Sequence, residues 1–231
     1  MSRVVAVTGG AGAIGRAVVE AMTDDGSLAV ALDLAEPGVG IRCDVTDETS
    51  VNTAFAQLAA SHGPVDVLVN AAGMTGRGSL LDESPDEWRQ ILDVNLTGAY
   101  LCCRAVLGDM VERGHGVIVN VASVNARFGG SGLSGPAYAA SKGGLLTLTR
   151  FIAREHAGDG IRANAVAPGP HDTPMWQALD AARRESILSM LPGGGIGSPH
   201  DLARVIDFLA SDDARYINGA TIDVNGGQWM G

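Results

Sequence analysis

Short runs rich in Val, Ala and Leu alternate with longer amphipathic stretches along this 231-residue chain. The short runs lie at residues 3–8, 28–33, 65–70, 116–121, 161–167 and 220–224, and the longer stretches at 13–25, 47–61, 85–112, 137–157 and 200–210. Strands that alternate with helices in this way indicate βαβ units, which build parallel sheets covered on both faces. The length suits one domain. We therefore expect a single α/β domain over residues 1–231, a doubly wound parallel sheet with helices on both faces.

One segment, residues 170–198, interrupts the alternation. It contains Pro170, Pro174, Pro192 and the triple glycine at 193–195, and it is too long for a routine connection. It also carries apolar side chains that a permanently open loop would expose, namely Met175, Trp176, Leu179, Ile187, Leu188 and Leu191. We interpret it as a mobile excursion with short helices that closes over a bound ligand as a lid.

Composition restricts the partners and the compartment. The chain has 16 Lys and Arg against 26 Asp and Glu, a net charge of −10, which disfavours nucleic acid and anionic membranes. No apolar run reaches the ~18 residues of a membrane span. The three cysteines, Cys43, Cys102 and Cys103, have neither disulfide nor metal-site spacing. We therefore expect a cytoplasmic protein that uses no metal.

A glycine-rich loop follows the first predicted strand and opens the first predicted helix, as Thr8-Gly9-Gly10-Ala11-Gly12-Ala13-Ile14-Gly15. This G-x-G-x-x-G pattern places backbone amides at a helix N-terminus, where they can receive a pyrophosphate. Asp33 lies 33 − 15 = 18 residues beyond Gly15, at the end of the second strand. A carboxylate there accepts hydrogen bonds from ribose hydroxyls and repels a 2′-phosphate. Together the loop and Asp33 predict a Rossmann-like fold that binds NAD. Without the glycine loop, Asp33 would be interpreted as an ordinary solvated carboxylate at the end of a strand.

A P-loop is excluded, because the glycines are followed by Arg16-Ala17 and not by Lys and then Ser or Thr. Further along, Tyr138 and Lys142 are four residues apart and share one face of a predicted helix. An ammonium group beside a phenol favours the phenolate, which makes the tyrosine a usable general base near neutral pH. Taken alone, this spacing usually means a surface pair.

Together these motifs resemble the classical short-chain dehydrogenase/reductase family over essentially the whole chain, in the right order. The resemblance implies a catalytic set of Asn95, Ser123, Tyr138 and Lys142. It also implies cofactor contacts from Gly9, Gly12, Ala13, Ile14, Gly15, Asp33, Asp44, Val45, Asn70, Ala71, Gly73, Tyr138, Lys142, Pro168, Gly169, His171 and Thr173.

The resemblance assigns a role to each catalytic residue. Ser123 binds the substrate oxygen, and Tyr138 exchanges its proton. Lys142 lowers the tyrosine pKa and holds the nicotinamide ribose, while Asn95 helps hold a water that relays protons to Lys142. The activity implied is NAD(H)-dependent interconversion of a secondary alcohol and a ketone by direct hydride transfer, in a homotetramer. The mostly apolar loops of the cleft suggest a hydrophobic or ring-containing substrate, with Arg77 able to receive an anionic or hydroxylated end.

Three positions depart from the family pattern. Ala13 stands where the middle glycine is usual, which puts a methyl group in a tight loop. His171 replaces an apolar residue, and we interpret it as a surface-loop histidine, with a pH-sensitive group near the nicotinamide as the alternative. Ser123 and Tyr138 are 15 residues apart, slightly more than usual, and the glycine-rich segment Gly129 to Gly135 can absorb the difference.

Two alternative functions stay open. The first is reduction of 3-oxoacyl groups on an acyl-carrier protein, by enzymes that generally use NADPH and dock an acidic carrier on basic residues. Asp33, the lack of Arg or Lys in Gly9 to Gly15 and the acidic composition all disfavour it. The second is a dinucleotide-binding regulatory protein with a silent site, which the intact Ser123, Tyr138 and Lys142 disfavour.

Overall fold

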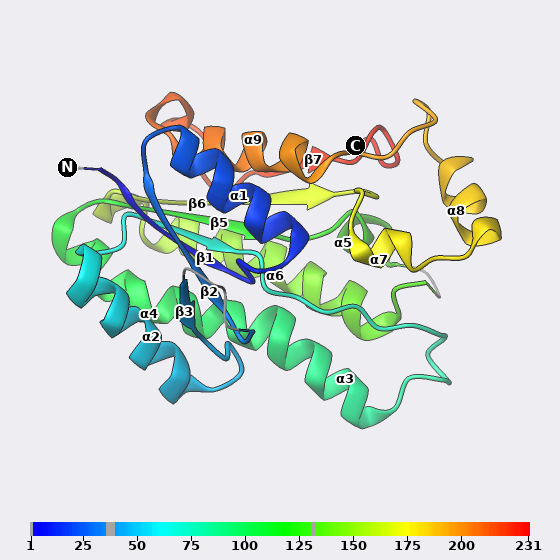
Figure 1. Ribbon diagram of the computed structural model, residues 1–231, viewed down its shortest axis with the longest axis horizontal. Coiled ribbons are helices and arrows are strands. Elements are labelled where there is room, and N and C mark those ends of the chain that lie inside the picture. The colour runs from blue at the N-terminus through cyan, green and yellow to red at the C-terminus, as the bar shows by residue number, and fades with distance from the viewer. Residues whose placement is uncertain (1, 36–39, 131–132) are drawn as a thin grey trace.

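Seven parallel strands form one sheet in the order β3-β2-β1-β4-β5-β6-β7 (Figure 1). The computed structural model describes residues 2–35, 40–130 and 133–231, together with every side chain in them except that of Met175. The strands are β1 Val4–Thr8, β2 Leu28–Asp33, β3 Gly40–Arg42, β4 Val67–Asn70, β5 Gly116–Val121, β6 Ile161–Pro168 and β7 Thr221–Val224. The predicted doubly wound parallel sheet is confirmed. β3 is an additional edge strand, and its three residues are too few to form a recognisable apolar run.

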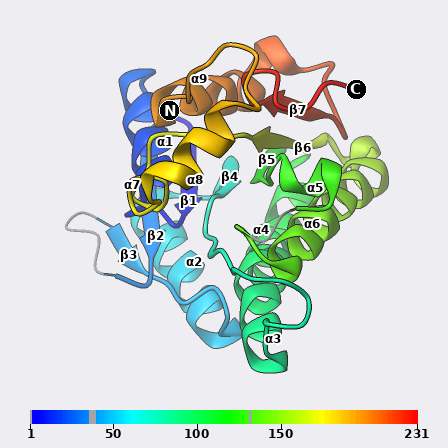
Figure 2. The same ribbon diagram turned by 90° about the vertical axis from the view of Figure 1, so that its right-hand side faces the viewer.

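Helices cover both faces of the sheet (Figure 2). One face carries α1 Ala13–Asp24 and α9 Pro199–Ala210, and the other carries α2 Glu48–His62, α4 Gly98–Arg113 and α6 Pro136–Glu155. The alternation along β1 explains the two layers, because successive side chains of a strand point to opposite faces. Val5 and Val7 join the core beneath α1 and α9, whereas Val4 and Ala6 join the core beneath α2 and α4.

Two helices begin with serine capping boxes. The Ser84 hydroxyl accepts a hydrogen bond from Glu87 N at the start of α3 Pro85–Leu92, and the Glu87 carboxylate accepts one from Ser84 N at 3.0 Å. Ser198 and Asp201 repeat the arrangement at the start of α9. Each box satisfies amides that a helix N-terminus would otherwise leave unpaired.

The helix predicted over 85–112 runs from Pro85 to Arg113 as α3, a π-helical turn η1 Asp93–Thr97, and α4. By length and mean hydropathy alone this 29-residue helix could cross a membrane, although it contains no uninterrupted apolar run of about 18 residues. The helix nevertheless packs along the sheet, with contacts from α4 to β4, β5 and α2. Burial accounts for part of its apolar character, because 39% of its most apolar window is buried.

The chain reverses its direction of winding between β1 and β4, which are neighbours although β2 and β3 lie between them in sequence. In doubly wound sheets, ligands bind at the carboxyl ends of the strands beside this switch point. On this side lie α5 Asn125–Phe128, α7 Pro174–Gln177 and α8 Ala181–Leu188 (Figure 1). The two short helices of the 170–198 segment are confirmed. A backbone bridge between His171 and Gly197 joins the two ends of this excursion.

Candidate active site

The glycine loop after β1 folds tightly against the loop after β4. Gly9 has φ +65°, and a Cβ atom there would lie 2.7 Å from the Ala72 Cα atom. A Cβ atom on Gly15 would collide with the Gly9 carbonyl oxygen. Gly12 is the N-cap of α1 and leaves that helix without a side-chain cap. The methyl group of Ala13 is accommodated at the first position of the helix. The amides of Gly10 and Gly12 donate to backbone carbonyls within the protein, so the amides at the start of α1 are the ones that an anion would meet.

Asp33, at the end of β2, holds the glycine loop. Its Oδ2 atom accepts a hydrogen bond from Ala11 N at 2.9 Å. The structure also brings Arg42 of β3 into register with Asp33, and the Arg42 guanidinium donates to the Leu34 carbonyl. The sequence analysis does not find this arginine, because the strand that carries it is not predicted. A cation therefore lies beside the acid that we expect to bind ribose.

The segments after β3 and β4 complete the predicted cofactor edge. Thr46 donates two hydrogen bonds to the Asp44 carboxylate, which lower the pKa of Asp44. Val45 packs beneath Gly98, where a Cβ atom would lie 2.8 Å from a Val45 methyl carbon. The Asn70 amide donates to Asn120 Oδ1 at 2.9 Å inside the core. The side chain of Asn70 therefore links β4 to β5 within the core.

Ala71 and Gly73 carry the chain from β4 to the catalytic residues. Ala71 N donates to the Thr8 carbonyl at 3.2 Å, which fixes the segment to the end of β1. A Cβ atom on Gly73 would lie 3.3 Å from both Asn95 Oδ1 and Lys142 Nζ. Glycine at this position avoids placing a side chain against Lys142 Nζ.

Asn95 occupies the π-helical turn η1 and is 1% exposed. Its Oδ1 atom accepts from Met74 N at 2.8 Å, and its Nδ2 atom donates to the Met74 carbonyl and to Ser141 Oγ. Such turns are rare and often mark functional sites. Asn95 thereby connects the loop after β4 to α6, through a partner, Ser141, that the sequence analysis does not identify.

Ser123, Tyr138 and Lys142 come together at the carboxyl end of β5. Ser123 follows β5, and a hydrogen bond links its hydroxyl to Tyr138. Nζ of Lys142 donates to the Val121 carbonyl at 2.8 Å. The helix α5 takes up part of the long spacing between Ser123 and Tyr138. Of the segment Gly129 to Gly135, residues 131–132 lie outside the described residues.

Burial opposes charge on both members of the catalytic pair. It raises the pKa of Tyr138, partly offset by the hydrogen bond from Ser123, and it lowers the pKa of Lys142 to about 8. The pKa of Tyr138 therefore lies above its ordinary value, whereas the resemblance implies that Lys142 lowers it. Because desolvation penalises each isolated charge, a phenolate and an ammonium formed together would be favoured over either one alone.

The segment after β6 supplies the remaining predicted contacts. A Cβ atom on Gly169, just after Pro168, would lie 2.8 Å from the Asn225 Cα atom, so the turn needs glycine there. The Thr173 hydroxyl caps α7 by accepting a hydrogen bond from Trp176 N. His171 is 6% exposed, with Nδ1 2.9 Å from the Gly169 carbonyl oxygen. The interpretation of His171 as a surface-loop residue is wrong, because the bridge at the base of the excursion buries it.

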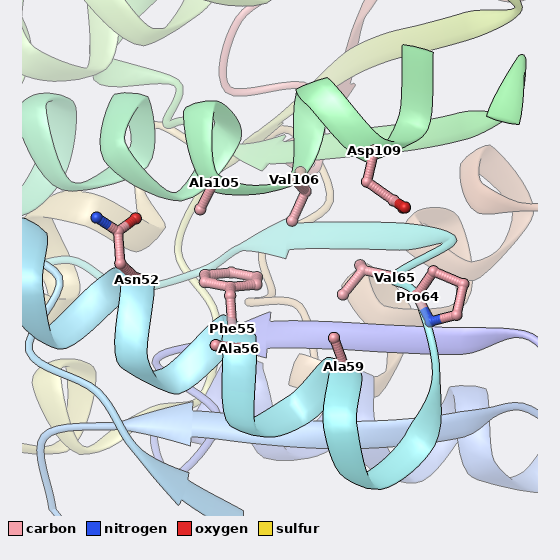
Figure 3. A pocket seen from close by; sticks show the side chains of 9 residues that line it. All are labelled: Asn52, Phe55, Ala56, Ala59, Pro64, Val65, Ala105, Val106 and Asp109. Atoms are coloured by element: carbon pink, nitrogen blue, oxygen red, sulfur yellow. The ribbon is translucent and has the colours of Figure 1, made fainter. Parts of the chain in front are cut away.

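Two of the hollows in the described part of the surface are relevant here. One of about 440 Å³ is lined by Arg77, Leu133 and Arg183, so it joins the loop after β4 to α8. The other, of about 490 Å³, lies between α2 and α4 and contains Phe55, Val106 and Asp109 (Figure 3). The second hollow holds no residue of the predicted site. The first lies among loops that the sequence analysis assigns to the substrate cleft.

Comparison with known proteins agrees with this geometry. Residues 9–228 match the family model described as enoyl-(acyl carrier protein) reductase. The 3-oxoacyl-[acyl-carrier-protein] reductase FabG of Escherichia coli (strain K12) is 36% identical over 240 residues, covering 99% of this chain and 98% of the relative. The 2-(R)-hydroxypropyl-CoM dehydrogenase of Xanthobacter autotrophicus (strain ATCC BAA-1158 / Py2) is 39% identical over 247 residues, covering 98% of both. The crystal structure of gox2181 has a TM-score of 0.93 at 33% identity, covering 98% of this chain and 95% of that one.

Proposed function

This chain belongs to the short-chain dehydrogenase/reductase family, and from that premise we propose that it interconverts a secondary alcohol and a ketone with NAD(H). The observation that supports the proposal most is the meeting of Ser123, Tyr138 and Lys142 at the carboxyl end of β5. A substrate oxygen placed there would accept a hydrogen bond from Ser123. Tyr138 would remove the alcohol proton in oxidation and return it in reduction.

The residues of the glycine loop fit a dinucleotide. The helices α2, α3 and α9 are capped by their own Asp or Ser side chains, whereas α1 begins at Gly12 with no side-chain cap. An uncapped helix N-terminus in a glycine loop is suited to the two phosphates. When bound, the nicotinamide accepts hydride from the alcohol carbon or returns it to the ketone. Lys142 would orient its ribose, and Asp33 would accept hydrogen bonds from the adenosine ribose.

The choice of NAD over NADP rests on Asp33. A 2′-phosphate beside this carboxylate would meet like charge, and Arg42, the nearby cation, is engaged by the Leu34 carbonyl. The relative named 2-(R)-hydroxypropyl-CoM dehydrogenase is a precedent within the family for a substrate with a secondary hydroxyl group.

A substrate panel tests this function. The purified protein would be incubated with NAD and cyclic alcohols, diols, sugar alcohols or hydroxy acids, and NADH formation would be followed by absorbance. The corresponding ketones would be tested with NADH. Turnover of at least one pair supports the proposal, and the absence of turnover in both directions across the panel contradicts it.

A second candidate function is reduction of 3-oxoacyl groups on an acyl-carrier protein. The observation that favours it is the full-length match to FabG proteins, including that of Vibrio harveyi at 38% identity. The two functions separate in one assay. A 3-oxoacyl thioester reduced faster with NADPH than any alcohol is oxidised with NAD would favour the carrier-linked reductase.

We also propose that the enzyme is a cytoplasmic homotetramer. Tyr100 on α4 and Phe151 on α6 are 47% and 60% exposed, large aromatic groups on one layer of helices. A Cβ atom on Gly143 of α6 would meet nothing within 4 Å, which leaves room for a neighbouring helix. The three cysteines are free, buried thiols, in keeping with a reducing compartment.

A further inference from the structure

We infer that Glu83 is a positioning residue for Tyr138, because its carboxylate holds the first turn of α6 from a loop outside that helix. The inference rests on the proposed function, in which Tyr138 transfers the proton. Glu83 lies between the cofactor edge and α3, in a part of the sequence where no motif draws attention to it.

The start of α6 lacks a side-chain cap of its own. Its N-cap is Gly135, with φ +74°, and its first residue, Pro136, has no amide hydrogen. The next amide, Ala137 N, donates to Glu83 Oε2 at 3.0 Å. The amide of Ala139 reaches the Gly135 carbonyl only at 3.5 Å. Glu83 therefore caps α6 by accepting a hydrogen bond from an amide of its first turn, as Ser84 and Ser198 do for the helices that follow them. Unlike those serines, it lies far from its helix in the sequence.

The surrounding backbone is built closely around this carboxylate. A Cβ atom on Gly76 would lie 2.7 Å from Glu83 Oε1, and one on Gly135 would lie 2.8 Å from the same atom. Gly76 N also donates to the Ser134 carbonyl at 3.0 Å. Within the described residues, Oε1 is buried and has no hydrogen-bond partner. A buried carboxylate oxygen without a partner is costly, so this arrangement is not the one that stability alone would favour.

The same loop also reaches the Tyr138 turn from a second direction. Met74 is bound on both of its backbone polar groups by Asn95, and Asn95 donates to Ser141 Oγ. The Ser141 hydroxyl in turn donates to the Tyr138 carbonyl at 2.8 Å. The loop is thus attached to α6 just before Tyr138 through Glu83 and just after it through Ser141. The position of the phenol relative to Ser123, which comes from β5, depends on both attachments.

The test compares two substitutions of nearly the same length as glutamate. Glu83→Gln keeps an oxygen that can accept from Ala137 N, whereas Glu83→Met removes the acceptor. With the best alcohol from the panel, we expect Glu83→Met to lower kcat about tenfold to hundredfold, because small misplacements of a reacting group have effects of this order. The KM for NAD should stay within about twofold, because no cofactor residue is altered, and Glu83→Gln should restore most of kcat.

Asp201→Ala is the matched control. It removes a carboxylate that accepts a hydrogen bond from Ser198 N at the start of α9. This helix contains no residue of the candidate active site. We expect the substitution to lower the unfolding temperature and leave kcat unchanged. A wild-type kcat in Glu83→Met would overturn the inference. A fractional loss of kcat no larger than the unfolded fraction of the variant, measured by circular dichroism, would also overturn it. If Glu83→Met does not fold, Glu83→Ala replaces it, because alanine removes the acceptor and relieves the crowding at Gly76.

A readout without substrate separates this inference from the proposed function. Hydrogen exchange of the amides at residues 137–140 should quicken in Glu83→Met and stay near wild type in Glu83→Gln. If the wild-type protein turns over no substrate, the proposed function fails. Independently of that result, equal hydrogen exchange at residues 137–140 in the wild type, Glu83→Met and Glu83→Gln would overturn the role of Glu83. Faster exchange in Glu83→Met alone would support the capping contact.

Discussion

Nζ of Lys142 lies 5.9 Å from the centroid of the Tyr138 ring, one turn further along α6. The two groups are close enough for an ammonium to stabilise a phenolate, yet burial shifts the pKa of each toward its neutral form. The pair is therefore neutral at rest above about pH 8. Transfer of the phenol proton to the amine would charge both groups together, which costs less than charging either alone. The phenolate formed in this way could then accept the proton of the alcohol.

Tyr138→Phe tests the proton carrier. The substitution removes only the phenolic oxygen, so the cofactor loop and the core stay intact. We expect turnover to fall by about 10² to 10⁴, the usual contribution of a general acid or base. NAD binding, measured by quenching of tryptophan fluorescence, should be unchanged. Near-normal turnover would show that another group transfers the proton.

Lys142→Met tests the cost of the buried amine. The folded-state pKa of about 8 lies below the ordinary 10.5, so between these pH values the unfolded chain binds more protons and wild-type stability rises with pH. Below pH 8 the full penalty applies. A pKa shift of this size corresponds to a destabilisation of the wild type by roughly 3 kcal/mol. The variant avoids this cost but loses the hydrogen bond to the Val121 carbonyl, which takes about 1 kcal/mol from its gain in stability.

We therefore expect Lys142→Met to be more stable than wild type at pH 7 and to lose this advantage near pH 10, while activity is abolished. Urea unfolding at the two pH values measures the difference. The same pH dependence in both proteins would show that the amine is not penalised by burial.

Asp33→Ala tests cofactor choice. A charged hydrogen bond contributes roughly 1.5–3 kcal/mol, so the wild-type ratio of kcat/KM for NAD over NADP should be about tenfold to hundredfold or more. The substitution should narrow this ratio in two ways. It should weaken the binding of NAD, and it should strengthen the binding of NADP, because the positive charge of Arg42 would no longer be offset by the Asp33 carboxylate. Adding Arg42→Ala to Asp33→Ala separates the two effects, because only the second depends on the arginine. A wild-type preference for NADP would contradict both the assignment of Asp33 and the ranking of the two candidate functions.

The 170–198 excursion should close when ligands bind. Its ends are joined by the hydrogen bonds Gly197 N to the Pro170 carbonyl and Asp172 N to the Gly197 carbonyl, so movement is expected beyond this base. Hydrogen exchange of 174–195 should slow when NAD and a substrate or inhibitor are added, whereas exchange at His171 and Gly197 should change little. Equal protection of 174–195 in the free and bound protein would contradict the lid.

Phe151→Glu tests the assembly. A charge on the exposed face of α6 should disrupt a helix interface without touching the core, because Phe151 is 60% exposed. We expect light scattering to report a tetramer for the wild type and a smaller species for the variant. A wild-type monomer at micromolar concentration would contradict the proposed homotetramer.

The family resemblance named the candidate catalytic set, and the sequence by itself determined the order of the motifs and the strands of the sheet other than β3. These follow from local patterns: apolar runs of strand length, a glycine loop between a strand and a helix, and a Tyr and a Lys one helical turn apart. The caps at Ser84 and Ser198 are equally local, because each pairs a serine with an acidic residue three positions later.

Only the tertiary structure decided what depends on contacts between distant segments. β3 has three residues and becomes a strand only by pairing with β2, which brings Arg42 to Asp33. His171 is buried by Gly197, and the start of α6 is held by Glu83, which lies 54 residues away in the chain. Burial also reversed the expected direction of the tyrosine pKa shift, because the cost of desolvation depends on the whole fold around a group and not on its neighbours in sequence.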